Sequence, residues 1–146
     1  MKELVIDCDS KILGRLASKV AKLLLSGESV VMVNAGKAVI SGHADAIAAS
    51  YKEKIELKDK ANPEHSPYFS RRPDLFVKRV IRGMLPYKKA KGRQAFKRLR
   101  VFAGMPEEYK GKEFYAMASK DKKDVFEKTI TVAELTSKLG YSKSRQ

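Results

Sequence analysis

The sequence predicts an α/β fold, in which a mostly parallel sheet carries helices on both faces. Short apolar runs typical of buried strands alternate with longer segments of helical periodicity, and short turns join them. Such an alternation implies right-handed crossovers between parallel strands. The chain has 146 residues, 43% of them hydrophobic, which is enough for one compact core. We therefore expect residues 1–146 to form a single domain.

The first part of the chain predicts three strands around one helix. Residues 2–7 are the first expected strand. Leucine, alanine and valine then recur at helical spacing, with Ser10 as the expected N-cap and Gly27 at the end of the helix. Residues 30–33 form an apolar run typical of a strand buried on both faces, and residues 38–40 predict a further short strand.

The middle of the chain predicts three helices and one loop. We expect a helix over residues 44–54 and a loop over 58–70, where two prolines and mixed charge occur. A helix over 74–85 is bounded by a proline at each end. Another short helix is expected from Gly92, followed by a strand over 101–103.

The last forty residues, 107–146, are charged but nearly balanced in sign. Thr131 and Glu134 have the spacing of a capping box at the start of a short helix, which is expected to end at Gly140. The final residues, 141–146, are expected to fray.

Most of the positive charge lies in residues 71–100. The chain has a formal net charge of +14, and this segment holds seven arginines and five lysines against one acid, Asp74. The rest of the chain therefore has a net charge of only +3. A protein this basic is attracted to polyanions, either nucleic acid or an anionic membrane surface. We disfavour the membrane because no helix pairs the basic residues with exposed apolar anchors.

The basic segment is predicted to be rigid. Arg79 and Arg82 lie on the polar side of one expected helix, while Arg93, Lys97 and Arg100 form a stripe on the next. Like charges at this spacing repel by about a few tenths of a kcal/mol per pair, and a bound anion would relieve the repulsion. Fixed guanidinium groups can also contact phosphates through two hydrogen bonds.

The pattern favours backbone and shape recognition of folded RNA over sequence-specific reading of DNA, because no base-reading helix is evident. Three aromatic residues flank the basic segment: Tyr68, Phe69 and Tyr87. They could stack on unpaired bases, or equally well pack on the domain itself.

An enzyme that handles phosphates or nucleotides is the first alternative. Asp7 and Asp9 flank the end of a strand, where catalytic carboxylates occur in α/β folds, and Lys37 follows a glycine. The phosphate-loop pattern is incomplete around Lys37, because the first glycine and the final Ser or Thr are missing. The expected role of Asp7 and Asp9 is to stabilise turns.

The remaining residues with reactive side chains do not indicate a cofactor site or a metal site, so we expect neither. Cys8 follows three apolar residues and is expected to be a small buried hydrophobe, since no base lies near it. His43 is expected at the start of a helix, and His65 lies 22 residues away without ligand-like neighbours. The N-terminal residues show no signal-peptide pattern and no apolar run is long enough to span a membrane, so we expect a cytoplasmic protein.

Residues 81–104, IRGMLPYKKAKGRQAFKRLRVFAG, closely resemble the signature of the universal ribosomal large-subunit protein thirteen family. The matching elements are RGMLP at 82–86, Gly92-Arg93 after a basic loop, and Leu99 with VFAG at 101–104. The stretches VIDCDSKILGRLASKVAKLLLSG and VVMVNAGKAVISG resemble the first strand, first helix and second strand of the same family. The resemblance covers about residues 1–105, and it is closer to the archaeal and eukaryotic branch than to the bacterial one.

The resemblance implies a three-layer α/β/α fold with a mostly parallel four-stranded sheet. It implies a structural, non-enzymatic role in the cytoplasmic ribosome: binding large-subunit rRNA early in assembly, beside neighbouring large-subunit ribosomal proteins, without a small-molecule substrate. It also implies that seven side chains face the RNA, which are Arg82, Lys88, Lys89, Lys91, Arg93, Lys97 and Arg100. Charge alone adds Arg71, Arg72 and Arg79, and Arg98 of the same basic segment is included with them.

Three further residues of the signature carry expectations about packing. Met84 and Leu85 are expected to pack in the core, and Gly83 is expected to permit a close approach of backbone or helix. A free RNA-binding regulator or chaperone outside the ribosome is the second alternative, because it would share the same basic segment.

Overall fold

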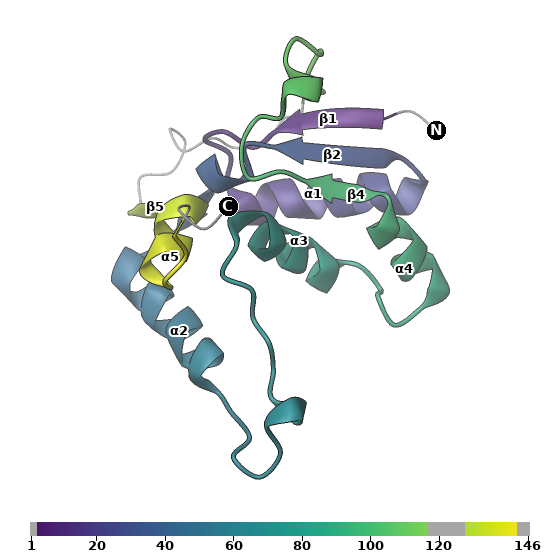
Figure 1. The fold of residues 1–146 in the computed structure, drawn as a ribbon. Coiled ribbons are helices and arrows are strands. Elements are labelled where there is room, and N and C mark those ends of the chain that lie inside the picture. The colour runs from purple at the N-terminus through teal and green to yellow at the C-terminus, as the bar shows by residue number, and fades with distance from the viewer. Residues whose placement is uncertain (1–2, 117–127, 143–146) are drawn as a thin grey trace.

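The computed structural model describes residues 3–116 and 128–142 (Figure 1). Its main sheet is parallel and has three strands in the order β1 (Glu3–Asp7), β2 (Ser29–Val33) and β4 (Leu99–Val101). The central strand is β2, which is almost wholly buried because both of its faces are covered. The predicted α/β class is confirmed.

The expected fourth parallel strand lies in a separate sheet. The strand β3 (Val39–Ser41) pairs antiparallel with β5 (Thr129–Thr131). The strand β3 also forms a parallel bridge with the segment after β1, between Val39 and Ile12. There the Val39 N–H donates to the Lys11 carbonyl at 2.9 Å. The sequence did not predict β5, because three residues are too few to show a two-residue period.

One face of the main sheet packs against helices. Ile6, Met32 and Leu99 point into a core shared with buried residues of four helices, which are α1 (Leu13–Ser26), α3 (Pro73–Met84), α4 (Ala90–Lys97) and α5 (Val132–Lys138). The predicted end of α1 is confirmed, since Gly27 has a φ of 105° and its N–H bonds the last turn. The predicted N-cap is wrong, because the N-cap is Ile12 and Ser10 lies two residues earlier with a φ of 56°.

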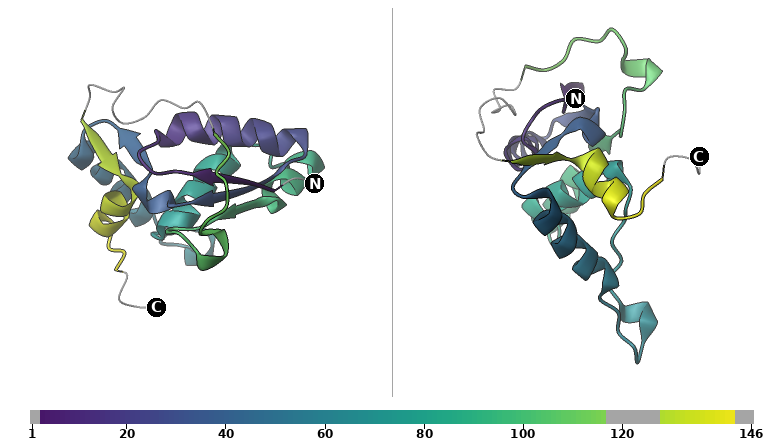
Figure 2. Two further views of the ribbon diagram at one scale, coloured as in Figure 1. Left: turned by 90° about the horizontal axis from the view of Figure 1, so that it is seen from above. Right: turned by 90° about the vertical axis from the view of Figure 1, so that its left-hand side faces the viewer.

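In the described part of the chain, a loop and not an α-helix covers the opposite face. Val5, Val31 and Val33 pack there against Tyr109 and the partly buried Phe102. Tyr109 ends a short 3₁₀ turn that follows β4, and Figure 2 shows this turn and α1 on opposite sides of the strands. Among residues 3–116 and 128–142, the element that covers this face is therefore a loop with a 3₁₀ turn, where the resemblance implied a second helical layer.

A projecting arm leaves the body of the molecule. It consists of α2 (Ala44–Glu56) and the loop from Leu57 to Ser70, which contains a 3₁₀ turn at Pro63–His65 (Figures 1 and 2). No residue of α2 is fully buried. Near the start of α2, Lys138 forms a 2.7 Å ion pair with Asp45.

The C-terminal helix α5 (Val132–Lys138) carries the predicted capping box. Glu134 N–H donates to Thr131 Oγ1, and Thr131 N–H donates to the Glu134 carboxylate, both at 3.2 Å. Residues 143–146, where most of the expected fraying falls, lie outside the described residues.

Candidate nucleic-acid interface

The basic segment folds into two helices joined by a short turn. Pro73 is the first residue of α3, where a missing N–H costs nothing. Phe76, Val77 and Ile81 bury one side of α3 against the core, and this leaves the side chains of Arg79 and Arg82 exposed. The amphipathic pattern thus sets which cations face outward.

Both exposed arginines of α3 lie over aromatic rings. The guanidinium carbon of Arg79 is 3.8 Å from the centre of the Phe69 ring, and its Nη1 donates to the Tyr68 carbonyl at 2.8 Å. The guanidinium carbon of Arg82 lies 4.7 Å from the centre of the Tyr87 ring. Each contact is favourable by about 0.5–1 kcal/mol at an exposed site and restricts the guanidinium plane.

Further contacts fix α4 relative to α3. The Lys78 ammonium lies 5.2 Å from the centre of the Phe96 ring, and the Phe96 and Tyr87 rings meet edge to face at 5.4 Å. Gly92 faces the backbone of Pro86 so closely that a Cβ at residue 92 would overlap the Pro86 carbonyl. The two helices and their turn therefore form one braced unit.

The expectations for the signature's packing residues are partly wrong. Leu85 is buried as predicted, but 41% of Met84 is exposed. A Cβ at Gly83 would meet no atom of the described residues within 4 Å, so Gly83 is not the site of a close approach in that part of the protein. Gly92 has that role, because the turn after α3 brings the Pro86 carbonyl against the first turn of α4.

The predicted three-residue stripe contains two residues. Arg93 and Lys97 lie one turn apart on the exposed side of α4. Arg100 does not continue that helix, because α4 ends at Lys97 and Leu99 begins β4. Strand side chains alternate, so the exposed Arg100 points away from the core face that Leu99 enters. The expected strand over 101–103 begins two residues earlier than predicted.

Arg98 is engaged within the fold. It is half-buried, and its Nη2 donates to the carbonyl of Leu24 in the last turn of α1 at 2.7 Å. Its Nε is buried without a hydrogen-bond partner in the described part of the protein. A cation at a helix C-terminus also interacts favourably with the helix dipole. Sequence reasoning missed this role because 74 positions separate the two residues.

The remaining side chains that were predicted to face RNA differ in whether they form an ion pair within the protein. Arg72 forms a two-pronged ion pair with Asp74, with hydrogen bonds of 3.2 and 2.9 Å, and this contact raises the pKa of the Arg72 guanidinium. Arg71 is exposed. Within residues 3–116 and 128–142, no ion pair involves five exposed cations, which are Lys88, Lys89, Lys91, Arg93 and Lys97.

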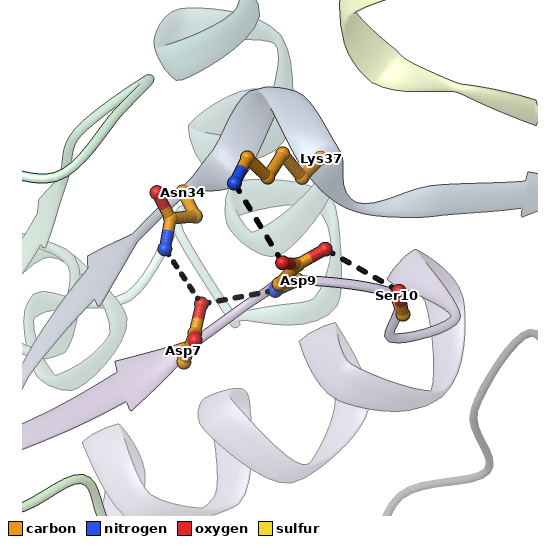
Figure 3. A network of polar contacts seen from close by, with 5 residues as sticks. All are labelled: Asp7, Asp9, Ser10, Asn34 and Lys37. Carbon is orange, nitrogen blue, oxygen red and sulfur yellow. Dashed lines mark hydrogen bonds and ion pairs between the residues drawn. The ribbon is translucent and has the colours of Figure 1, made fainter.

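The strand-end residues of the enzyme alternative stabilise a turn (Figure 3). Asp7 Oδ1 accepts hydrogen bonds from Asn34 Nδ2 and from the Asp9 N–H, both at 3.0 Å. The Asp9 carboxylate lies 3.7 Å from the Lys37 ammonium and accepts a hydrogen bond from Ser10 Oγ at 3.3 Å. These contacts link the turn after β1 to the turn after β2. They engage the carboxylates of Asp7 and Asp9, which the enzyme alternative would need for catalysis.

The other reactive residues lie where the sequence placed them. Cys8 is buried, and burial raises the pKa of its thiol to about 12. His43 is the N-cap residue of α2, as expected. The described residues contain no group of three or more side chains suited to a metal ion, and no helix among them is long and apolar enough to cross a membrane.

Comparison with known proteins adds independent evidence. A model of the family "Ribosomal protein L13" matches residues 1–108. The large ribosomal subunit protein uL13 of Archaeoglobus fulgidus is 48% identical over 139 residues, covering 94% of this chain and 87% of that protein. The uL13 of Methanosarcina barkeri is 49% identical over 138 residues, covering 93% and 96%.

The uL13 of Methanocaldococcus jannaschii is likewise 49% identical over 137 residues, covering 93% of this chain and 96% of that protein. All three relatives are archaeal, in agreement with the branch that the resemblance indicated. Their coverage extends well past residue 108, into the C-terminal region where the sequence signature is least distinctive. The chain therefore belongs to the ribosomal protein L13 family, as an archaeal-like member of a family of structural, non-enzymatic proteins.

Proposed function

We propose that this chain is a component of the large ribosomal subunit and binds large-subunit rRNA through one surface of α3 and α4. This α3–α4 basic surface consists of Arg79, Arg82, Lys88, Lys89, Lys91, Arg93 and Lys97. The observation that carries the proposal is that all seven cations are exposed without an ion-pair partner in the described chain, on a unit braced by aromatic contacts.

The bracing favours a rigid polyanion as the partner. Side chains that are already ordered lose little conformational entropy on binding, whereas a disordered basic tail would lose much more. Arginines with fixed guanidinium planes suit phosphate groups, and lysines add point charge. Folded rRNA presents such phosphates in a fixed arrangement, and the uL13 relatives are named as large-subunit proteins.

Four residues that were predicted to bind RNA lie outside this surface, and we expect them to contribute differently to RNA binding. Arg71 is exposed two residues before the start of α3, so we include it as a peripheral contact. Arg72 is paired with Asp74 and Arg98 is bonded to Leu24, so we assign both to the fold. Arg100 is exposed on the other face of the sheet, and it contacts the RNA only if the RNA wraps around that edge. We further propose that binding occurs early in assembly, in the cytoplasmic ribosome beside neighbouring large-subunit proteins.

The first test is a double charge reversal, Arg93→Glu with Lys97→Glu. We expect it to abolish binding to a large-subunit rRNA transcript and to leave the circular dichroism spectrum unchanged, because both side chains are exposed. The matched control is Lys52→Glu with Lys54→Glu on α2, which makes the same charge change on another exposed helix. Equal loss of binding in both variants would mean that net charge, not this surface, binds the RNA.

The second test separates the ribosomal role from the free regulator. A cell lysate is sedimented on a sucrose gradient before and after a high-salt wash, and the fractions are probed for this chain. A loosely bound basic protein washes off, because each neutralised phosphate contributes about −0.7 to −0.9 to the log–log salt slope. We expect retention with large subunits. Release to the top fractions would overturn the ribosomal assignment.

A further inference from the structure

The structure distinguishes the three aromatic residues that flank the basic surface. Phe69 lies under the Arg79 guanidinium, and Tyr87 lies under that of Arg82, so each already has a cation on its ring. Tyr68 has no such contact with any described residue and is 84% exposed, the highest value among the large hydrophobic side chains that the structure describes. Of the three rings, Tyr68 is the most exposed and has no cation on either face among the described residues, so it is the best placed to receive an incoming planar group.

The backbone that carries Tyr68 is held in place. Its carbonyl accepts the 2.8 Å hydrogen bond from Arg79 Nη1, and the next residue, Phe69, packs under the same guanidinium at 3.8 Å. The arm therefore delivers Tyr68 to a fixed position at the edge of the α3–α4 basic surface. An exposed ring on a fixed backbone can stack with little further loss of entropy, since a tyrosine has few rotatable bonds.

A groove of about 750 Å³ lies beside Tyr68, between the arm and the start of α3. Pro67 and Leu75 give it apolar walls, and Arg71 and Arg72 line it as well. Leu75 is itself 41% exposed. An apolar ring face next to guanidinium groups matches the two parts of a nucleotide, a flat base and a phosphate. Arg71 is the better phosphate donor, because Arg72 is paired with Asp74.

We propose that Tyr68 stacks on an unpaired base of RNA and that Arg71 contacts the adjoining phosphate. This inference rests on the proposed function and deepens it, because it adds a single-stranded nucleotide to a surface otherwise suited to phosphates of folded RNA. Recognition of RNA by stacking on an aromatic side chain requires unpaired bases, whereas bases within a helix are not accessible in this way.

The test compares Tyr68→Ala, Tyr68→Phe and the control Tyr115→Ala in the full chain. Tyr115 is also exposed, at 45%, but lies after the 3₁₀ turn that covers the other sheet face. The probes are a large-subunit rRNA transcript, a short single-stranded RNA carrying the fluorescent base 2-aminopurine, and a perfectly paired RNA duplex. Affinities are measured at several salt concentrations.

We expect Tyr68→Ala to weaken binding to the single-stranded probe and to the transcript by about 5- to 150-fold, the range for one lost stack. Binding to the duplex should not change, and neither should the salt slope. Tyr68→Phe should restore the affinity and the quenching of 2-aminopurine, because the ring face is retained. Arg71→Ala should lower the salt slope by about 0.7, the value for one phosphate contact in single-stranded RNA.

The outcomes separate this inference from the proposed function. If the unmodified chain binds the transcript and Tyr68→Ala binds every probe equally well, base stacking is overturned and the basic surface stands. If Tyr68→Ala binds all RNA probes normally but is lost from sedimenting large subunits, Tyr68 contacts a protein and stacking is again overturned. If the unmodified chain binds no RNA, both proposals fall.

Discussion

At the scale of the residue, arginines that look alike in the sequence have different roles in the fold. Arg93 is exposed on α4, Arg98 is bonded to Leu24, and Arg100 lies on the opposite sheet face. The sequence predicted the charged segment correctly, because charge and amphipathic spacing are local. It could not separate Arg98 from its neighbours, because the carbonyl that Arg98 bonds lies in a helix far away along the chain.

Arg98→Ala should destabilise the fold and leave RNA binding intact. Removing the charged hydrogen bond to Leu24 should lower the free energy of unfolding by about 1.5 kcal/mol, the lower end for a charged donor, because the Leu24 carbonyl keeps its bond from Gly27 N–H. Urea unfolding measures this change. Arg93→Ala is the control, with normal stability but weaker binding to the rRNA transcript. A reversed result would place Arg98 in the interface.

Cys8 should be unreactive in the folded protein. Burial, and secondarily the nearby Asp7 carboxylate, raises the pKa of its thiol to about 12. We expect iodoacetamide to label the native chain very slowly at about pH 8 and to label it rapidly in urea, because the thiolate is the reactive form. Mass spectrometry follows the labelling. Rapid modification of the native chain would show that the β1 edge opens.

The same pKa shift predicts a loss of stability in strong alkali. Below about pH 9 the thiol of Cys8 is protonated in both states and has no effect on the pH dependence. Between that pH and about 12 the unfolded thiol ionises while the folded one does not. The contribution of Cys8 to the free energy of unfolding therefore falls as the pH rises through this window. Cys8→Ala should remove that part of the slope in a pH series of urea titrations.

At the scale of the element, the sequence predicted the helix ends well but not the bounds and partners of the shortest strands. Gly27 ends α1 and Thr131 begins the capping box of α5, because both are properties of a few adjacent residues. The position of β4 and the existence of β5 depend on which strand lies alongside, and three-residue strands carry little signal of their own. The packing of α4 after α3 likewise depends on Gly92, which lies against the backbone carbonyl of Pro86.

Gly92→Ala should disrupt the turn between α3 and α4. The added methyl would overlap the Pro86 carbonyl and would lie 2.9 Å from the Tyr87 nitrogen, so the backbone must shift. Overpacking of this kind costs about 1–3 kcal/mol. The displaced Tyr87 should also release Arg82, which predicts weaker RNA binding as well as a lower melting temperature.

Gly83→Ala is the matched control for this substitution. Gly83 lies in α3 with open space where a Cβ would be and without a positive φ. Replacement by alanine should stabilise the helix by up to about 1 kcal/mol. Thermal unfolding of both variants measures the difference. Equal melting temperatures would show that the Pro86 contact does not determine the position of α4.

At the scale of the whole molecule, the fold concentrates charge at one side and projects a nearly neutral arm. Residues 44–70, which comprise α2 and the loop that follows it, carry four lysines and five acids. This segment therefore does not attract phosphates by charge, and its exposed Tyr68 must act through its ring. The sequence predicted this uneven distribution of charge. It did not predict that the helices carrying the charge share one sheet face while Arg100 lies on the other.

The last prediction asks whether RNA meets one face of the molecule or wraps around the sheet edge. Each phosphate contact that is lost should reduce the log–log salt slope by about 0.7–0.9. If the RNA lies on the α3–α4 basic surface alone, Arg93→Ala should reduce the slope by this amount and Arg100→Ala should leave it unchanged, although only seven positions separate them. Both side chains are exposed, so neither change should alter stability by more than about 0.5 kcal/mol.

Titration of the rRNA transcript at several salt concentrations measures both slopes. Equal reductions would mean that the RNA covers both faces of β4, and the proposed interface would then have to include the loop after this strand.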